Sequence, residues 1–352
     1  MRKNRILIIV VIVLAVAAVI LIFQSRRNTL RSDWVEFAIN DTSNVTKIYM
    51  ADMQGNEVLL KKISPSHWTL NDSLTARQDG VEMLLNTMSR LAVKAPVPRA
   101  TYNTVIKRLA STSVKVEVYQ EKYRINLFNK FKLFPHEKRT RTYYVGSSTP
   151  DNQGSFMLKE GSDTPFVVYI PGFKGYVSAR FTAYVSDWRD HTIFAKRPSE
   201  IHEIKLEFPQ EPDESYSLEK RSANEVILTP AGSNEPLNSF DTTRVIEFFN
   251  AFRNIRFEVA FENITDAHKD SILAQTPLHR ITLTDTTGNS RTVTTYRRSN
   301  LVLAEDYDGN LLPYDLDRLY ALLPGGNELV IVQYFVFDPI TRPLDWFKVE
   351  SR

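Results

Sequence analysis

The residues able to perform chemistry are few, and they are widely separated along the chain. No two of the six histidines form an H-x-x-H, H-E-x-x-H or H-x-H pair, so a zinc site would need ligands from distant segments. The histidines are His67, His136, His191, His202, His268 and His279. The chain has no cysteine, which excludes thiolate metal sites and a cysteine nucleophile. We therefore expect neither a bound metal nor a cofactor.

One cluster combines a histidine with an acid and an aromatic ring, in the sequence Trp188-Arg189-Asp190-His191. An aspartate beside an imidazole can hold it in one tautomer for general-base catalysis, which makes these four residues a candidate groove. An ion pair and a ring stack that pin a domain junction explain the same residue types. We favour this structural interpretation, and we name no catalytic residue.

One segment is spaced in part like a calcium-binding loop, which has ligands at positions 1, 3, 5 and 12. Asp306, Asp308 and Asn310 stand at the first three of these positions, and Asp317 stands at the twelfth. Leu311 occupies the position at which such loops need glycine, and Asp317 is shorter than the usual bidentate glutamate. A hairpin turn at Asp308-Gly309, between two apolar runs, explains the segment better.

Basic and aromatic residues are interleaved between residues 122 and 144. Basic charge beside aromatic faces suits an anionic polymer, a lipid headgroup or an acidic partner. The alternative, which we favour from the sequence, is a solvated hairpin whose aromatic side chains face the core in alternation. The candidate binding residues in this stretch are Lys130, Lys132, Lys138, Arg139 and Arg141.

Sequence signatures of nucleotide and acyl-transfer enzymes are missing. The chain has 12 glycines and contains no G-x-x-x-x-G-K-[ST], G-x-G-x-x-G or G-x-S-x-G motif, which argues against ATP hydrolysis and against a serine hydrolase of the common kind. Its 41 acidic residues do not single out the carboxylate pair that glycoside hydrolysis requires. We therefore expect an accessory protein rather than an enzyme.

A long apolar run lies near the N-terminus. Residues Ile6 to Phe23 are all Ile, Leu, Val, Ala or Phe, enough for about 27 Å of helix at roughly 1.5 Å per residue, which nearly spans a bilayer core. A cleaved signal peptide usually has a shorter apolar region that ends in small residues, whereas Gln24-Ser-Arg-Arg27 follows this one. We therefore predict an uncleaved signal anchor with a single transmembrane helix.

Positive charge near this segment sets its expected orientation. Three Lys or Arg residues flank the run on each side, and the extra amine of the short N-terminal tail favours an N-terminus inside the cell. The bulk of the chain would then face the periplasm from the inner membrane. Removing the six bases of the first 31 residues from the total of 44 leaves 38 basic against 41 acidic residues, which excludes a globally basic nucleic-acid binder.

The rest of the chain shows one pattern of elements twice. Short β-rich runs begin at Val45, and a stripe of apolar residues with helical spacing begins at Val81. A strand-like run at Ile201 lies 156 residues after Val45, and a second helical stripe at Val245 lies 164 residues after Val81. We interpret this pattern as a duplicated unit of antiparallel sheet plus helices, which is an α+β fold.

Turn residues and apolar runs complete the expected organisation. Asp285-Thr-Thr-Gly-Asn289 predicts a hairpin turn, and the apolar run from Leu329 to Phe337 predicts a buried strand. The expected parts of the chain are a membrane anchor at 1–31, a juxtamembrane connector at 32–44, a first α+β unit at 45–187 and a second α+β unit at 188–352.

Several of these segments together resemble one protein family, the membrane-anchored form, common in Bacteroidota, of the domain of unknown function 4340. The matching segments are the anchor followed by Val45-Thr-Lys-Ile48, Trp68, Thr75-Ala-Arg77, Lys94-Ala-Pro-Val-Pro98, Tyr143-Tyr-Val-Gly146, Trp188-Arg-Asp190 and Gln333-Tyr-Phe-Val-Phe-Asp338. These are packing and turn motifs, so the resemblance transfers no catalytic or binding residue. It implies a cell-envelope protein of unknown activity, and relatives often accompany ABC-type export or gliding-motility components.

Three functional hypotheses follow. The leading one is a single-pass, periplasm-facing accessory or scaffold protein beside an ABC-type exporter or a gliding-motility apparatus, with no nucleic-acid partner. The second is an anchored cell-envelope enzyme that acts on glycan, with Asp190 and His191 in a groove between the units. The third is a binding module for an anionic envelope polymer, through residues 122 to 144.

Overall fold

The structure of the protein is a computed structural model. It describes residues 36–127, 131–222, 225–233, 235–261, 264–301, 303–326 and 328–349, together with Leu14 and Val16. The predicted membrane segment from Ile6 to Phe23 therefore lies outside the described residues, apart from those two positions. No helix in the described part of the chain is long and apolar enough to cross a membrane.

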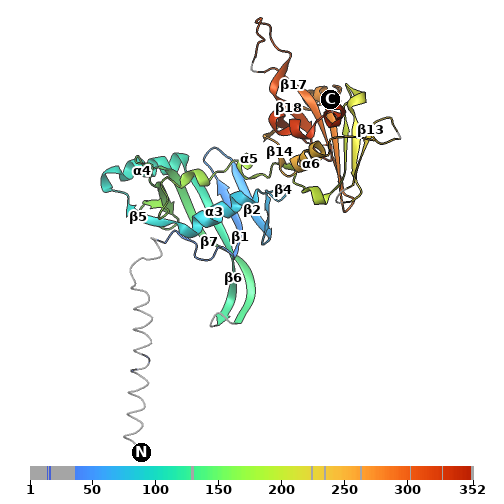
Figure 1. Cartoon of the computed structure of the whole chain (residues 1–352). Helices are drawn as coiled ribbons and strands as arrows, with labels where there is room; N and C mark the ends of the chain where they lie inside the picture. Colours follow the sequence, from blue (N-terminus) through green and yellow to red (C-terminus); the bar gives the residue numbers. More distant parts are fainter. Residues whose placement is uncertain are drawn as a thin grey trace, which may run out of the picture. The chain divides into compact units, whose positions relative to one another are not determined.

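The described residues fold into two compact units, which divide between Asp190 and His191. Every pairing between the named strands is antiparallel. The chain is thus mostly antiparallel sheet with a few helices (Figure 1), which agrees with the α+β class predicted from the sequence.

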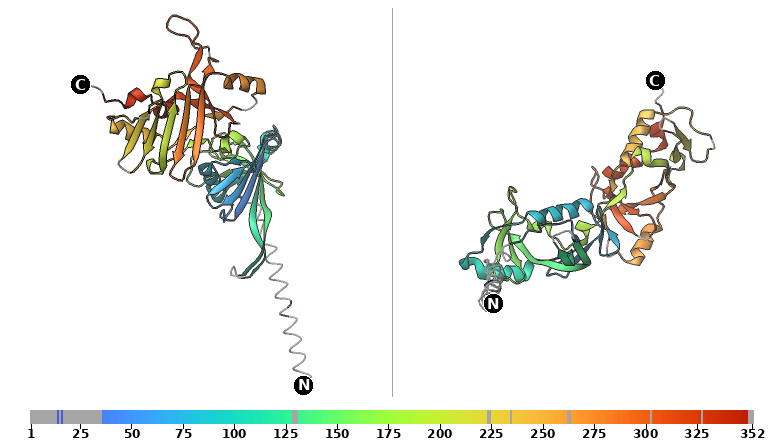
Figure 2. Two further views of the ribbon diagram at one scale, coloured as in Figure 1. Left: turned by 90° about the vertical axis from the view of Figure 1, so that its right-hand side faces the viewer. Right: turned by 90° about the horizontal axis from the view of Figure 1, so that it is seen from below.

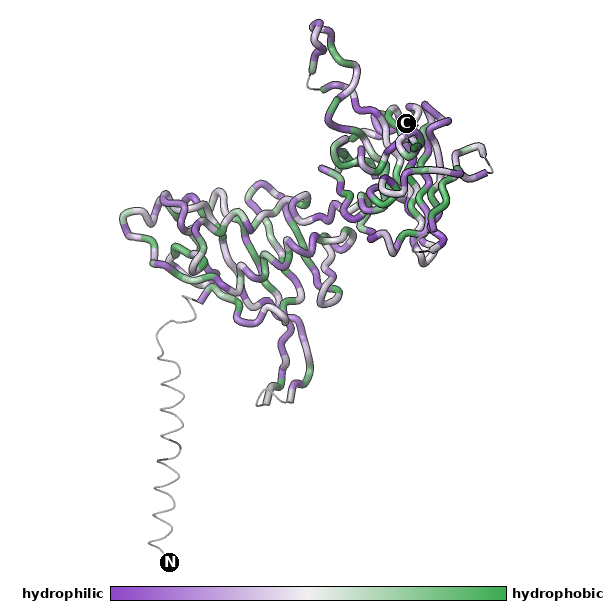
Figure 3. The backbone as a smooth tube through the Cα atoms, viewed as in Figure 1, coloured by the Kyte–Doolittle hydropathy of each residue, from purple (hydrophilic) through white to green (hydrophobic). Residues whose placement is uncertain are grey.

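The first unit is built on a nine-stranded sheet, in the order β4-β3-β2-β1-β6-β7-β8-β9-β5. Its strands are β1 (Val45–Ala51), β2 (Glu57–Ser64), β3 (His67–Leu70), β4 (Leu74–Thr75), β5 (Ala92–Pro96), β6 (Val114–Leu127), β7 (Phe131–Ser148), β8 (Ser155–Lys159) and β9 (Phe166–Tyr169). Ile48 and Met50 of β1 lie opposite Val118 and Val116 of β6, and all four are buried. Figure 3 shows the resulting alternation of hydrophobic and hydrophilic residues along the strands, because successive side chains of a strand point to opposite faces.

Helices cover both faces of this sheet. The helices of the first unit are α3 (Gln78–Arg90), α4 (Arg99–Thr112) and the short α5 (Val185–Trp188). The apolar stripe of α3, from Val81 to Met88, lies in the main core as its helical spacing predicts. On α4, Leu109 packs against Phe156 and Leu158 of β8. Since Met157 lies between these two residues and faces the main core, α4 covers the opposite face from α3.

The second unit is built on an eight-stranded sheet, in the order β13-β12-β11-β16-β17-β18-β19-β15. Its strands are β11 (Ile201–Glu207), β12 (Tyr216–Lys220), β13 (Val226–Pro230), β15 (Val259–Ala260), β16 (His279–Asp285), β17 (Ser290–Ser299), β18 (Tyr314–Leu322) and β19 (Leu329–Gln333). A separate two-stranded sheet pairs β10 (Thr192–Phe194) with β14 (Ile255–Arg256). If β4 is left out, the two large sheets have the same order: β1, β2 and β3 of the first correspond to β11, β12 and β13 of the second, and β5 to β9 correspond to β15 to β19.

The core of the second unit is rich in aromatic rings. Its helices are α6 (Thr242–Ala251), α7 (Asp266–Leu273) and α8 (Tyr334–Phe337). Phe248 of α6 forms edge-to-face contacts with Tyr216, Phe252 and Phe347, at ring-centroid distances of 6.1, 5.4 and 5.3 Å. On the other face of the sheet, Ile272 of α7 belongs to a smaller cluster of buried residues.

The buried strand predicted from Leu329 to Phe337 is too long. The β-branched residues up to Val332 form β19, which ends at Gln333, and the chain then turns into α8. Within this short helix Phe337 is buried and Phe335 is exposed, a division that one buried strand would not produce. The apolar run therefore contains two elements, and residue type does not give the boundary between them, because aromatic and β-branched residues both favour strands.

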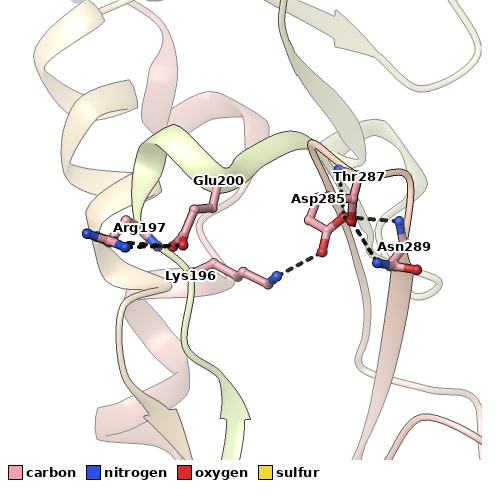
Figure 4. A network of polar contacts seen from close by, with 6 residues as sticks. All are labelled: Lys196, Arg197, Glu200, Asp285, Thr287 and Asn289. Atoms are coloured by element: carbon pink, nitrogen blue, oxygen red, sulfur yellow. Dashed lines mark hydrogen bonds and ion pairs between the residues drawn. The ribbon is translucent and has the colours of Figure 1, made fainter.

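A buried carboxylate organises the turn between β16 and β17 (Figure 4). Asp285 accepts hydrogen bonds from the backbone N–H groups of Thr287 and Asn289, and Lys196 Nζ lies 2.8 Å from its other oxygen. The hydrogen bond from Lys196 and that from the Thr287 hydroxyl lower the pKa of Asp285. This is the hairpin turn predicted from Asp285 to Asn289, and Gly288 supplies its positive φ of 85°.

Replacing Phe248 with alanine tests the importance of this aromatic core. We expect Phe248→Ala to lower the free energy of unfolding by about 3 to 5 kcal/mol, because it removes a fully buried ring and leaves a cavity. Ile246→Ala, on the same helix but with 62% of the residue exposed, should change it by no more than about 0.5 kcal/mol. Urea unfolding of both variants measures the difference, and equal losses would contradict this description of the core.

Candidate anion-binding site

Two strands of the first unit extend beyond the strands on either side of them. β1 pairs with β6 only from Lys115 to Gln120, and β8 pairs with β7 only from Tyr143 to Ser148. Pairing between β6 and β7 continues well past these limits, to Leu127 and Phe131. The distal part of the β6–β7 hairpin therefore projects from the sheet, as Figure 1 and the left view of Figure 2 show.

A bulge lies where the hairpin leaves the sheet. Val118 pairs with Arg141 and Tyr119 with Arg139, so Thr140 is an extra residue in β7. A bulge of this kind bends its strand and changes the direction of the side chains around it. Thr140 donates a hydrogen bond of 2.8 Å to the side chain of Gln120, which fixes the bend.

A pocket with a volume of about 660 Å³, lined largely by basic residues, lies at the base of the hairpin. It lies between the hairpin and the segment Ile39–Asp41, which the Gln120 amide holds through a hydrogen bond of 2.7 Å to the Asp41 carbonyl. The residues that line it are Ile39, Asn40, Asp41, Gln120, Lys122, Tyr123, Arg124, His136, Lys138, Arg139, Thr140 and Arg141. We call these residues the basic cleft.

The cations of the basic cleft differ in how far they are neutralised. Arg139 lies 2.9 Å from Glu117, and Arg141 lies 3.4 Å from Glu36. By contrast Lys122, Arg124 and Lys138 are exposed and form no ion pair with any residue that the structure describes. None of these three cations is therefore neutralised by a salt bridge within the described residues, although the charge of Lys122 also acts on Asp41.

The one carboxylate in the cleft is already bound to its own turn. Asp41 accepts hydrogen bonds from the backbone N–H and hydroxyl of Ser43 and from the amide of Asn44. The Ser43 hydroxyl, together with these other donors, lowers the pKa of Asp41, although partial burial acts in the opposite direction. The basic cleft therefore combines three unpaired cations with one satisfied anion.

Two buried nitrogen atoms of the cleft residues also lack partners. They are Nδ1 of His136 and Nε of Arg141, which have no hydrogen-bond partner in the described part of the chain. Buried polar atoms are almost always hydrogen-bonded in folded proteins, and a bound ligand is one way in which such atoms are satisfied. These two atoms have almost no accessible surface, so it is the exposed cations of the cleft that suit a group with several acceptor oxygens, such as a phosphate or a carboxylate.

The structure brings together part of the predicted basic site. Lys138, Arg139 and Arg141 line the cleft, whereas Lys132 lies further along the hairpin with Nζ 5.4 Å from the centre of the Tyr123 ring. Lys130 lies outside the described residues. The aromatic alternation that we favoured from the sequence holds for Tyr143, which is buried against Phe37, but not for the exposed Phe134.

Sequence reasoning missed one wall of the cleft. Residues 32 to 44 were expected to form a connector, yet Phe37 and Ile39 are buried in the core of the first unit. Tyr143 donates a hydrogen bond to the Phe37 carbonyl, and Ile39 donates its N–H to Met88. The isolated aromatic residue in a polar stretch was the available signal, because such a side chain needs a core to bury it.

The candidate groove at residues 188–191 is divided between the two units. In the first unit, Trp188 is buried and donates a hydrogen bond of 2.8 Å to the Thr182 carbonyl, and the backbone of Arg189 bridges to Ala76. Asp190 donates its N–H to Thr75. In the second unit, the His191 ring stacks on Phe257 at a centroid distance of 4.3 Å. Each residue thus has a structural contact within its own unit.

The remaining candidate ligands have other roles. Asp306 accepts backbone hydrogen bonds from Asp308 and Asn310 and so closes a turn. Burial lowers the pKa of His279 to about 4, and its ring contacts Thr295 and Phe208. Within the described ranges no group of three or more His, Cys, Asp or Glu residues is placed to hold a metal ion.

Comparison with known proteins gives one match. A family model described as a domain of unknown function (DUF4340) matches residues 67–275. No curated protein and no solved structure matches the chain.

Glu117 at the base of the hairpin predicts a dependence of stability on pH. Burial raises the pKa of this carboxyl, but hydrogen bonds from Lys115, Tyr119 and Arg139 outweigh burial and hold the pKa at about 2. Its contribution to stability is therefore complete above the unfolded pKa of about 4.5 and is lost as the pH falls towards about 2. We expect Glu117→Gln to destabilise the protein by about 2 kcal/mol at pH 7, since solvent screens the partly exposed cations.

Denaturant unfolding of wild type and Glu117→Gln across this pH range measures the effect. The difference between the two should shrink as the pH falls from about 4.5 to about 2. A difference that stays constant over this range would show that Glu117 is not held in its charged form by these contacts.

Proposed function

We propose that this chain, which belongs to the domain of unknown function family DUF4340, is a membrane-anchored cell-envelope protein that binds an anionic ligand and catalyses no reaction. The observation that carries the proposal is the basic cleft, in which Lys122, Arg124 and Lys138 have no ion-pair partner among the described residues. The ligand class is a polymer that carries phosphate or carboxylate groups. Such a polymer can contact several unpaired cations at once, which is how clustered positive charge gains affinity.

The location forms part of the same proposal. The apolar run from Ile6 to Phe23 and the charges beside it support an uncleaved anchor in the inner membrane, with both units in the periplasm. Twelve residues lie between Phe23 and Glu36, so the first unit would stay within about 45 Å of the membrane at roughly 3.5 Å per residue. A protein held there meets the anionic groups of the envelope and its lipids.

We also propose that the two units arose by duplication, in a member of the Bacteroidota type. The corresponding strand orders support this, since β11 begins 156 residues after β1 and occupies the same place in its sheet. One helix contributes to the main core of each unit, and a second helix packs with a separate cluster. The long projecting hairpin belongs to the first unit, which gives that unit the ligand-binding role and leaves the second for partners such as ABC-type export or gliding-motility components.

Removing the three unpaired charges tests the proposal. We expect Lys122→Gln, Arg124→Gln and Lys138→Gln together to weaken the binding of long-chain inorganic polyphosphate to the full chain in mild detergent by about tenfold, as each exposed contact is worth about 0.5 kcal/mol. Fluorescence anisotropy of labelled polyphosphate measures the affinity.

A matched variant removes the same charge elsewhere in the first unit. Arg99, Lys107 and Lys174 are exposed, and changing all three to Gln should leave the affinity unchanged. Raising the salt from about 0.05 M to about 0.5 M should weaken wild-type binding sharply. Equal affinities for the two triple variants, or binding that resists salt, would overturn the proposal.

A further inference from the structure

A second pocket of the first unit lies beside helix α3 and shares no residue with the basic cleft. It has a volume of about 330 Å³, and it lies between the first two turns of α3 and the segment 179–188. All of its lining residues belong to the first unit. We call it the α3 pocket. Its size is at the lower end of the range of pockets that bind small organic ligands.

The buried part of the α3 pocket is apolar. Leu84 and Trp188 line it and are almost fully buried, and the more exposed Met83 lies beside them. Trp188 donates its indole N–H to the Thr182 carbonyl at 2.8 Å, so the polar atom of this ring is already satisfied. A ligand in the pocket would therefore meet apolar surface there, which favours a ligand with an apolar side chain.

Arg180 supplies one charge of the pocket. Its Nη1 donates a hydrogen bond of 2.8 Å to the Thr87 hydroxyl, and its guanidinium lies 4.6 Å from the centre of the Phe173 ring. Neither partner is charged, and Arg180 forms no ion pair with any residue that the structure describes. These contacts hold the guanidinium in place without neutralising it. A guanidinium held in this way suits a carboxylate, which it can bind through two hydrogen bonds.

The backbone that carries Arg180 is also held in place. Val177 and Phe181, on either side of it in the sequence, are buried in the main core of the first unit. Ser155 Oγ accepts hydrogen bonds of 3.1 and 3.0 Å from the backbone N–H groups of Val177 and Ser178. The position of the guanidinium is therefore set before a ligand binds, which lowers the entropic cost of binding.

Asp187 supplies a charge of the opposite sign. One of its carboxylate oxygens accepts a hydrogen bond of 2.7 Å from the Thr182 hydroxyl. Within the described ranges Asp187 forms no ion pair with a basic residue, Arg180 included. The third charged residue of the pocket, Arg77, is paired with Asp79 at 3.4 Å. The α3 pocket thus combines one unpaired cation, one unpaired carboxylate and an apolar surface.

We infer that the α3 pocket binds a zwitterion with an apolar side chain, which is the chemistry of an apolar amino acid or of a short apolar peptide. The carboxylate of the ligand binds Arg180, and its ammonium group binds Asp187. Its side chain covers Leu84 and Trp188. A simple anion would leave Asp187 unpaired, and a simple cation would leave Arg180 unpaired. The inference goes beyond the proposed function and does not depend on it.

Titration of the full chain with leucine and its analogues tests this inference. Saturation-transfer NMR of the ligand methyl groups, in deuterated mild detergent, measures each dissociation constant. We expect N-acetylleucine, which lacks the ammonium group, to bind about threefold more weakly than leucine, because Asp187 is exposed and its contact is screened. Leucinamide, which lacks the carboxylate, should bind about tenfold more weakly, because it loses the paired hydrogen bonds from Arg180. Alanine, which covers less of the apolar surface, should also bind more weakly than leucine.

Variants show whether each charge of the pocket acts on its own group of the ligand. Asp187→Asn should weaken the binding of leucine about threefold but should not weaken that of N-acetylleucine, which has no ammonium group to lose. Arg180→Gln should weaken the binding of leucine about tenfold but should not weaken that of leucinamide. Arg99→Gln and Asp163→Asn, which remove exposed charges outside the pocket, should bind leucine as the wild type does.

Three results would overturn the inference. They are the absence of leucine binding at millimolar concentration, binding of leucine no tighter than that of either analogue, and a loss in the Asp187 and Arg180 variants that is equal for all ligands. The last result would assign these residues a structural role alone. The comparison of analogues uses the wild-type chain, so it tests the inference even if a variant fails to fold.

A further ligand distinguishes the two sources of this chemistry. Tighter binding of the dipeptide dileucine than of leucine would support the inference and identify a short peptide as the ligand. Tighter binding of leucine would support it and identify a free amino acid. The variant that combines Lys122→Gln, Arg124→Gln and Lys138→Gln should bind leucine as the wild type does, so the α3 pocket and the basic cleft are tested separately.

Discussion

Hydrogen bonding between β6 and β7 continues after β1 and β8 have ended, and the candidate site depends on this extra pairing. Within the sheet, the face that carries Val116 and Val118 is covered by the core. Beyond Gln120 the same face carries Lys122 and Arg124, since alternate residues of a strand share a face. One continuous strand thus passes from an apolar surface to a charged one, and the basic cleft forms at the transition.

The polar contacts at the base of the hairpin explain why the projecting part can keep its charge. Glu117 holds Lys115 and Arg139, and Glu137 holds Lys47, so the carboxylates lie near the root of the hairpin. Lys122, Arg124 and Lys138 have no such partners in the described structure. Their mutual repulsion is modest, because each is exposed to water and screened by salt. The hairpin can therefore be folded and still present unpaired charge to a ligand.

The sequence predicted those features that depend on local pattern. The apolar stripe from Val81 gave the correct position of α3, and the turn residues from Asp285 to Asn289 gave the correct hairpin. The basic and aromatic segment after residue 122 was identified as a candidate binding surface, and three of its five named cations line the cleft. In each case the periodicity or the turn chemistry of a short stretch carries the information.

What could not be predicted depends on contacts between distant segments. Phe37 and Ile39 are buried against a sheet, and some of its strands lie more than a hundred residues further along the chain. The hydrogen bond from Tyr143 to the Phe37 carbonyl is one such contact. Within the described ranges Lys122 and Lys138 form no ion pair, which depends on where Glu117 and Glu137 lie, and spacing along the sequence does not give this. Arg139 was a candidate ligand by its charge, and its contact with Glu117 at the hairpin base could not be read from the sequence.

Amide hydrogen exchange of the full chain with and without polyphosphate tests the central claim most directly, because it reports where a ligand is bound without changing any residue. Our account predicts slower exchange in residues 120–125 and 133–141, with the second unit unchanged. Protection confined to the second unit, with exchange in the hairpin unaltered, would contradict it.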